Sequence, residues 1–278
     1  MENLDMIECK SFHKFASVLG SAFFLLAMGG AAMGEAPAKA GAWDWATGPS
    51  IHDEEGKRDW GVEVVPYLWV AGLDGALGLP NVGTIGVSAS FSDLASNLDS
   101  GVAGLMDFRY RRWHLLVDGS WVRLTKTLAP DGPVIGSATV TPSVAFGTAG
   151  VSYELPLDWP VSVEAYLAAR WWHITTDATL VIAGTPFSGG LTEVWADAIV
   201  GTRISYAITD KWRVRLLADV GAGEADLDWQ VLASVSWMFH RNVGMTLAYR
   251  ITGVDYSSST LVYDMRQSGF LLGFNFAY

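Results

Sequence analysis

Two histidines are candidates for acid–base chemistry, and His114 has the more suitable spacing. His114 precedes Asp118 by four residues, and residues four apart on a β-strand point to the same face. A carboxylate beside an imidazole can orient the ring for general-base work. His173 stands at the outer end of an expected strand. A histidine beside a carboxylate in a protein interior more often has a structural role, so we predict no catalytic residue and no enzymatic activity.

Other patterns for catalysis or metal binding are missing from the sequence. None of the histidines that follow the leader has a partner at metal-ligand spacing, and no Gly-x-Ser-x-Gly motif of a nucleophile elbow occurs. The only cysteine, Cys9, lies in the N-terminal leader, so no disulfide or thiol nucleophile is expected in the mature chain. We therefore predict neither a metal nor a cofactor.

A second group of candidate residues consists of charges inside strongly apolar segments. We expect these charges to line an interior, where a single unpaired charge would cost several kcal/mol. Acids and bases are equal in number in this group, so its members can pair. The predicted lumen-lining residues are Glu63, Asp107, Arg109, Asp118, Glu164, Arg170, Asp197, Arg203, Arg213, Arg215, Asp219 and Arg250.

The elements that carry these charges are predicted to be long β-strands. Between Val161 and His173 the odd positions are apolar, and the even positions include Ser162, Glu164 and Arg170. A period of two makes one face apolar and one polar. Strands of about ten residues can cross a membrane, whereas strands of soluble domains average about 5–6 residues. The expected strands are 60–72, 101–111, 113–126, 137–154, 160–176, 190–206, 211–222, 227–239, 243–255 and 260–278.

This pattern predicts an all-β fold, an antiparallel transmembrane β-barrel of about ten strands, with eight to twelve compatible. Val82–Phe91 is a candidate extra strand, and Ser92–Leu98 is expected to form one or two helical turns capped by Ser92. Short turns and longer loops alternate along the chain. Short turns are expected at 111–112, 157–158, 209–211 and 240–242, and longer loops at 73–84, 127–136, 177–189 and 256–260.

Aromatic residues predict which face meets lipid. An indole near a charged residue at a strand start is typical of the aromatic belt at a membrane surface. The predicted belt consists of Trp60, Trp113, Trp159 and Trp212. In the closing strand Ser268–Tyr278, large apolar residues alternate with mostly small ones. This strand resembles the signal that the outer-membrane assembly machinery reads, and the signal residues are Phe270, Phe274, Phe276 and Tyr278.

The domain prediction has three parts. Residues 1–40 are expected to be a signal peptide, cleaved after about residue 34–40, because Lys10 and Lys14 precede the apolar stretch Phe15–Met33. Residues 41–59 are expected to be a flexible periplasmic lead-in, and residues 60–278 the barrel. The formal net charge of −11 and pI near 4.8 argue against nucleic-acid binding.

Several short motifs together resemble a broad family of uncharacterised Gram-negative outer-membrane β-barrel proteins. They are Pro66-Tyr67-Leu68-Trp69 with Gly72 and Gly75, then Ser90–Leu94, then Tyr249-Arg250 with Asp255-Tyr256, and the closing strand. The resemblance implies location in the bacterial outer membrane. The partners to expect there are outer-membrane lipid, lipopolysaccharide and the assembly machinery. The resemblance implies no activity or site residues.

Three functions are compatible with these observations. The first is an integral outer-membrane barrel with a narrow charged lumen, in a structural role or as a passive porin-like path for small solutes. The second is a lipid-modifying outer-membrane enzyme, a hydrolase or an acyltransferase. The third is a soluble periplasmic β-barrel that binds a ligand.

Overall fold

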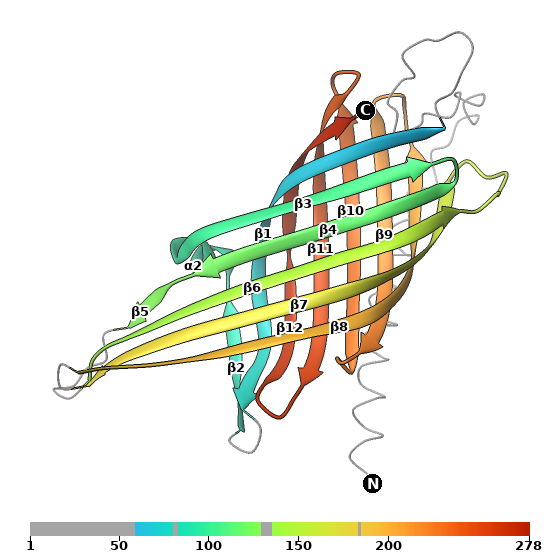
Figure 1. The fold of residues 1–278 in the computed structure, drawn as a ribbon. Helices are drawn as coiled ribbons and strands as arrows, with labels where there is room; N and C mark the ends of the chain where they lie inside the picture. Colours follow the sequence, from blue (N-terminus) through green and yellow to red (C-terminus); the bar gives the residue numbers. More distant parts are fainter. Residues whose placement is uncertain (1–58, 80–82, 129–134, 183–184) are drawn as a thin grey trace. The chain divides into compact units, whose positions relative to one another are not determined.

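A computed structural model describes residues 59–79, 83–128, 135–182 and 185–278 (Figure 1). The predicted signal peptide, 1–40, and the lead-in, 41–59, lie outside these ranges except for Asp59. Within these ranges, no helix is long and apolar enough to cross a membrane.

Ten long antiparallel strands form a closed barrel. The ring closes because β12 pairs with β1, from Glu63 opposite Ala277 to Gly78 opposite Val262. This confirms the predicted fold class. In chain order the strands are β1 (Trp60–Leu79), β3 (Leu98–Tyr110), β4 (Trp113–Leu124), β6 (Ile135–Glu154), β7 (Ser162–Ile182), β8 (Thr185–Ala207), β9 (Trp212–Gly223), β10 (Leu227–Met238), β11 (Val243–Ser257) and β12 (Val262–Ala277).

Alternating residues account for the inner and outer faces of the strands. In β12, Leu271, Asn275 and Ala277 are buried, whereas Phe270 and Phe274 are exposed on the outer face. On the inner face Gly269 allows a close approach between strands, since a Cβ there would lie only 1.9 Å from the carbonyl oxygen of Val70. The small side chains of β12 therefore let it pack tightly against β1.

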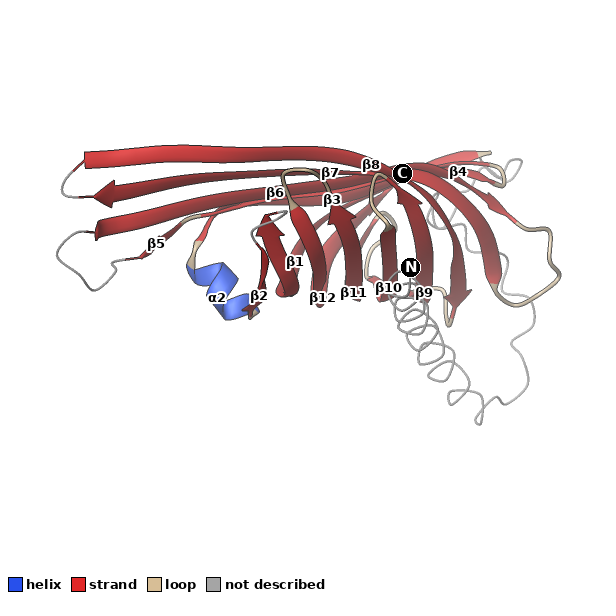
Figure 2. Cartoon of the chain, turned by 90° about the horizontal axis from the view of Figure 1, so that it is seen from below, coloured by secondary structure: helices blue, strands red, loops and turns tan. Residues whose placement is uncertain are grey.

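Several strands are longer than the sequence predicted, which corrects the expected loops. β1 continues to Leu79, β7 continues to Ile182, and β8 already begins at Thr185. Most of 73–84 and 177–189 is therefore strand. The Gly, Ser and Asp content of these stretches suggested loops, but pairing between β7 and β8 satisfies their backbone hydrogen bonds. The far ends of β6, β7 and β8 reach beyond α2 (Figures 1 and 2).

Two short strands lie outside the closed ring. The candidate strand Val82–Phe91 is observed as β2 (Gly83–Ala89), which pairs with the far half of β1. β5 (Lys126–Leu128) pairs with β6. Neither strand takes part in closure, so the barrel itself has ten strands and not twelve.

The expected helical turns occur as α2 (Phe91–Ser96), but their cap is different from the one predicted. Ser90, not Ser92, is the N-cap, because its backbone is extended and its hydroxyl accepts a hydrogen bond from the Asp93 amide. The Asp93 carboxylate in turn accepts hydrogen bonds from the Ser90 hydroxyl and amide, which hold the pKa of Asp93 below its ordinary value.

Candidate functional site

The inner face of the barrel carries a cluster of charges around Arg203. The register places Glu164 of β7 directly opposite Arg203 of β8. The guanidinium donates to Glu164 at 2.6 Å and to Asp107 of β3 at 2.7 Å. His114 of β4 also contacts Asp107, at 2.8 Å between Nδ1 and Oδ1. Strands far apart in the sequence are thus joined across the lumen by charge-assisted hydrogen bonds.

A second cluster surrounds Arg170, which is completely buried. Its guanidinium donates to both oxygens of Asp219 at 2.9 and 3.0 Å, to Asp228 at 2.8 Å and to the hydroxyl of Thr148 at 3.0 Å. The indole of Trp172 donates to the other oxygen of Asp228 at 2.9 Å. This arginine therefore holds two buried carboxylates in place.

A third cluster joins β11 to β1 and β4. Arg250 donates to Asp118 at 2.6 Å and to the Tyr67 hydroxyl at 2.9 Å, and Tyr67 donates to Asp118 at 2.8 Å. The guanidinium also lies over the rings of Tyr67, Trp69 and Phe146, at 5.2, 5.4 and 5.8 Å from their centroids. These distances permit cation–π attraction in a desolvated setting.

A fourth, mostly uncharged network surrounds Glu63. Its carboxylate accepts a hydrogen bond from the Asn275 amide at 2.6 Å and lies 3.6 Å from the guanidinium of Arg215. Asn275 then accepts from the Thr246 hydroxyl, which is bonded to Ser236. This chain of hydrogen bonds crosses β1, β12, β11 and β10.

Beyond the charged clusters, toward the far ends of β7 and β8, the lumen is filled by aromatic rings. Trp195 stacks on Tyr256 with centroids 4.0 Å apart and on Trp172 with centroids 5.8 Å apart. Trp172 and Trp195 are each only 1% exposed. We call this group the aromatic layer, and its members are Trp69, Phe146, Trp172, Trp195, Tyr256 and Tyr263.

The turn between β11 and β12 covers the aromatic layer. Leu261, in this turn, is 3% exposed and packs with the layer. The Glu193 carboxylate of β8 accepts hydrogen bonds from the hydroxyls of Tyr256, Ser258 and Thr260. These bonds tie the turn to β8, which is not a neighbour of β11 or β12 in the sheet.

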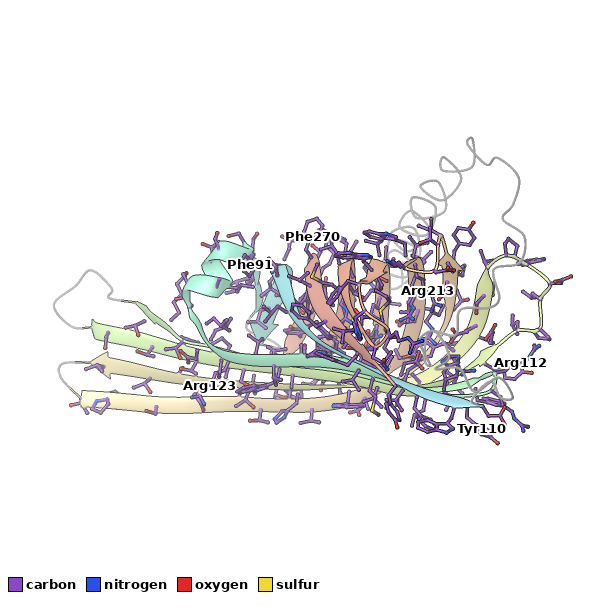
Figure 3. All side chains as sticks on the ribbon, turned by 90° about the horizontal axis from the view of Figure 1, so that it is seen from above. Phe91, Tyr110, Arg112, Arg123, Arg213 and Phe270 are labelled. Atoms are coloured by element: carbon purple, nitrogen blue, oxygen red, sulfur yellow. The ribbon has the colours of Figure 1, made fainter. Side chains whose placement is uncertain are left out.

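Many side chains point into the barrel. Figure 3 shows side chains crowding the space that the strands enclose. Between the charged clusters lies a cavity of about 50 Å³, bordered by Asp118, Arg203, Arg215 and Arg250 together with leucines. A cavity of this size can hold water, since about 10–15 Å³ of such volume is sufficient for one molecule.

The structure places the predicted lumen-lining residues as follows. Arg109, Asp118, Arg213 and Arg215 are partly exposed. The others are buried, namely Glu63, Asp107, Glu164, Arg170, Asp197, Arg203, Asp219 and Arg250. Asp197 differs from the other buried acids, because its Oδ1 accepts from the Ala225 amide and its Oδ2 has no hydrogen-bond partner among the described residues.

Sequence reasoning missed Asp228 and the aromatic layer. Asp228 is completely buried, and its position in β10 shares the inner face with Gln230. Trp172 likewise shares the inner face of β7 with Glu164 and Arg170. Odd or even position within the strand could have placed these residues on the inner face. A tryptophan is also common on a lipid-facing surface, however, so its residue type alone did not indicate an inner position.

His114 and Asp118 share one face of β4, as expected, but each contacts other residues. His114 contacts Asp107 on the neighbouring strand, while Asp118 bonds Tyr67 and Arg250. Cross-strand neighbours lie closer than residues two pleats apart on one strand, which explains why His114 contacts Asp107 and not Asp118.

His173 lies on the outer face of β7 and contacts the Thr175 hydroxyl at 3.3 Å. Absence of catalysis stays a prediction, and no group of metal-binding side chains is found among the described residues.

The predicted belt and closing-strand residues are on the outer surface. Trp60 contacts Tyr278, Trp113 contacts Tyr153 and Trp212 stacks on Trp237, with centroid distances of 5.8, 4.8 and 5.8 Å. The exposed residues include Trp159 at 63% and the closing-strand residues Phe270, Phe274, Phe276 and Tyr278 at 57, 50, 49 and 62%. Their roles as belt and assembly signal stay predictions.

Comparison with solved structures agrees with the geometry. The outer membrane protease OmpT from Escherichia coli superposes with a TM-score of 0.51, at 7% sequence identity, over 78% of this chain and 96% of that one. The fold is that of an outer-membrane β-barrel. At this identity the likeness extends to the fold alone.

Other solved barrels match less well. The monoaromatic hydrocarbon channel CymD has a TM-score of 0.33 at 10% identity, covering 80% of this chain and 88% of that one. Neisserial surface protein A has a TM-score of 0.28 at 14% identity, covering 80% and 99%. No model of a protein family and no curated protein sequence matches the chain.

Proposed function

We propose that this chain is an integral protein of the bacterial outer membrane whose barrel is closed and has a structural role. The observation that carries the proposal is the stack of the charged clusters and the aromatic layer across the lumen. Arg170 and Trp172, adjacent levels of that stack, are both buried and both bound to Asp228. A passive solute path would have to displace both levels.

The charged clusters support a structural role because their central arginines are paired with carboxylates. Arg170 and Arg203 each bind two carboxylates. Arg250 binds Tyr67 and Asp118, which are also hydrogen-bonded to each other. Water-filled pores instead line their interiors with hydrated polar groups. Buried charges that satisfy one another are costly to separate, so these clusters favour one fixed arrangement of strands.

Planar-bilayer recordings on the refolded full chain test this proposal. We expect no current above background, because the aromatic layer and the Arg170 cluster leave no continuous aqueous path. A variant with Trp172→Ala and Trp195→Ala removes much of the aromatic layer and one hydrogen bond to Asp228, but it keeps the ion pairs of Arg170 with Asp219 and Asp228, so it should also stay closed. Trp171→Ala, which removes an outward indole of the same strand, is the matched control. Reproducible unitary currents from the unaltered protein would overturn the proposal.

A further inference from the structure

The outer surface of β4, β6, β7 and β8 changes character along the strands. From the row of Trp113 opposite Tyr153 to the row of Trp121 opposite Ala145, the outward positions are almost entirely apolar. The step from Trp113 to Trp121 covers about 27 Å of strand at ~3.4 Å per residue. At a tilt of about 35–45° this corresponds to roughly 20 Å of height, close to the apolar band of outer-membrane barrels.

Beyond that row the outward positions carry hydroxyl groups. The next row places Ser143 opposite Thr175, and Thr175 opposite Thr192. Two rows further, Thr127, Thr139, Thr179 and Ser188 stand in one line across β5, β6, β7 and β8. We define the hydroxyl face by Thr139, Thr141, Ser143, Thr175, Thr179 and Ser188.

Hydrogen bonds between neighbouring strands hold these hydroxyls in fixed positions. Thr127 contacts Thr139 at 3.2 Å, and Thr179 contacts Ser188 at 3.1 Å. Thr125 contacts Thr141 at 3.3 Å. β-Branched threonines have restricted χ1 angles, so the hydroxyl face is organised before any ligand arrives.

The opposite face of the same strand segments is mainly apolar, so the two faces differ in chemistry. Val144 and Leu191 point inward and pack against the aromatic layer. The hydroxyl face therefore looks away from the lumen, and its members are exposed or half-buried.

The chemistry of the hydroxyl face favours a saccharide over a protein. Each hydroxyl can donate and accept hydrogen bonds, as sugar hydroxyls do. Protein interfaces need apolar or aromatic anchors at their centre, and the hydroxyl face is built of serine and threonine. It carries few charges, with Asp177 within it and Arg123 and Asp99 beside it, and these are of mixed sign, so it does not fit a strongly charged polymer.

We propose that the hydroxyl face binds the core oligosaccharide of lipopolysaccharide in the surrounding outer leaflet. In barrels of this kind the short turns face the periplasm, so the short turn 111–112 marks the periplasmic end, and the hydroxyl face lies toward the other, outer end. The sugars of that lipid begin where its acyl chains end, which is the level at which this surface changes from apolar to hydroxyl. The proposal rests on the outer-membrane location put forward above and extends it to a specific partner. It does not depend on whether the lumen conducts.

Binding of fluorescently labelled lipopolysaccharide to the full-length protein in non-ionic detergent tests the proposal. Lipopolysaccharide with a complete core should bind about tenfold more tightly than lipid A alone, a difference of roughly 1.4 kcal/mol. Free core oligosaccharide should compete with complete lipopolysaccharide and lower its apparent affinity to that of lipid A. The variant Thr139→Val with Thr179→Val, which keeps the β-branched shape, should reduce binding of the complete form to that of lipid A.

The matched control is Thr176→Val with Thr185→Val, two threonines on the inward side of the same sheet, and it should bind as the unaltered protein does. Heat-dependent gel mobility establishes that every variant is folded. Equal binding of lipid A and complete lipopolysaccharide would overturn the proposal. So would a loss of lipid A binding in the Thr139 and Thr179 variant, because the surface would then contact lipid and not sugar. Competition by core oligosaccharide needs no variant, so the test stands even where a variant fails to fold.

Discussion

At the residue scale, the buried ions differ in how much each one holds together. Arg170 is the common partner of Asp219, Asp228 and Thr148, and its side chain is completely buried. Removing one member of a buried ion cluster leaves charges without compensation in a medium of low polarity. Arg123, in contrast, lies on the outside and approaches Asp99 only to 3.9 Å. Such an exposed pair contributes little.

We predict that Arg170→Met lowers the free energy of unfolding by about 3–5 kcal/mol, because Asp219 and Asp228 are left buried and unpaired. Arg123→Met should change it by less than about 1 kcal/mol. Urea unfolding of the protein refolded into lipid vesicles measures both. Adding Asp219→Asn and Asp228→Asn to Arg170→Met should restore much of the loss, since the charges are then gone. An Arg170→Met protein as stable as the original would show that the cluster contributes nothing.

At the element scale, β12 separates its two faces most clearly. Its outward residues are large and apolar from Phe270 to Tyr278, whereas Arg266 and Asp264 mark its polar end. Leu272 lies midway between Arg266 and Tyr278 and is 42% exposed. In a membrane-spanning barrel such a position lies near the middle of the bilayer.

We predict that Leu272→Arg destabilises the barrel in lipid vesicles by about 2–4 kcal/mol, the cost of an arginine at the bilayer midplane. Ser268→Arg on the same face, nearer the polar end, should cost only about 0–1 kcal/mol. Refolding yield and urea midpoints in vesicles give the comparison. Equal effects at the two positions would contradict the assignment of this face to lipid.

On the scale of the whole molecule, the backbone ring is closed and its interior carries many side chains. The ring is completed by β12 and β1, and paired charges and the aromatic layer lie inside it. A ten-stranded ring leaves an interior that side chains can fill. The far ends of β6, β7 and β8 then extend the sheet beyond the apolar band and present the hydroxyl face.

We predict that the protein sediments with bacterial envelopes, resists extraction by salt or alkali and dissolves only in detergent. The reason is the broad outer surface of exposed Leu, Val, Phe and Trp side chains, which water alone would not solvate. The folded barrel should migrate differently on gels before and after heating. Recovery in the soluble periplasmic fraction would refute both the location and the lipopolysaccharide proposal.

Periodicity alone was sufficient for the architecture, because the pleat of a strand repeats every two residues. The alternation in Val161–His173 and in the closing strand already separates an apolar face from a face of polar or small residues, and its recurrence along the chain predicts a barrel of about ten strands. The outward side of Phe270 and the inward side of Glu63 follow from it directly.

The partners inside the lumen were decided only by the tertiary structure. Arg203 meets Asp107 from β3 and Arg250 meets Asp118 from β4, across separations of 96 and 132 residues. Contacts across the lumen depend on the exact number of strands in the ring and on the stagger between them. Local sequence does not encode either quantity. For the same reason the switch of His114 from Asp118 to Asp107, the burial of Asp228 and the stacking of Trp195 on Tyr256 became visible only in the closed barrel.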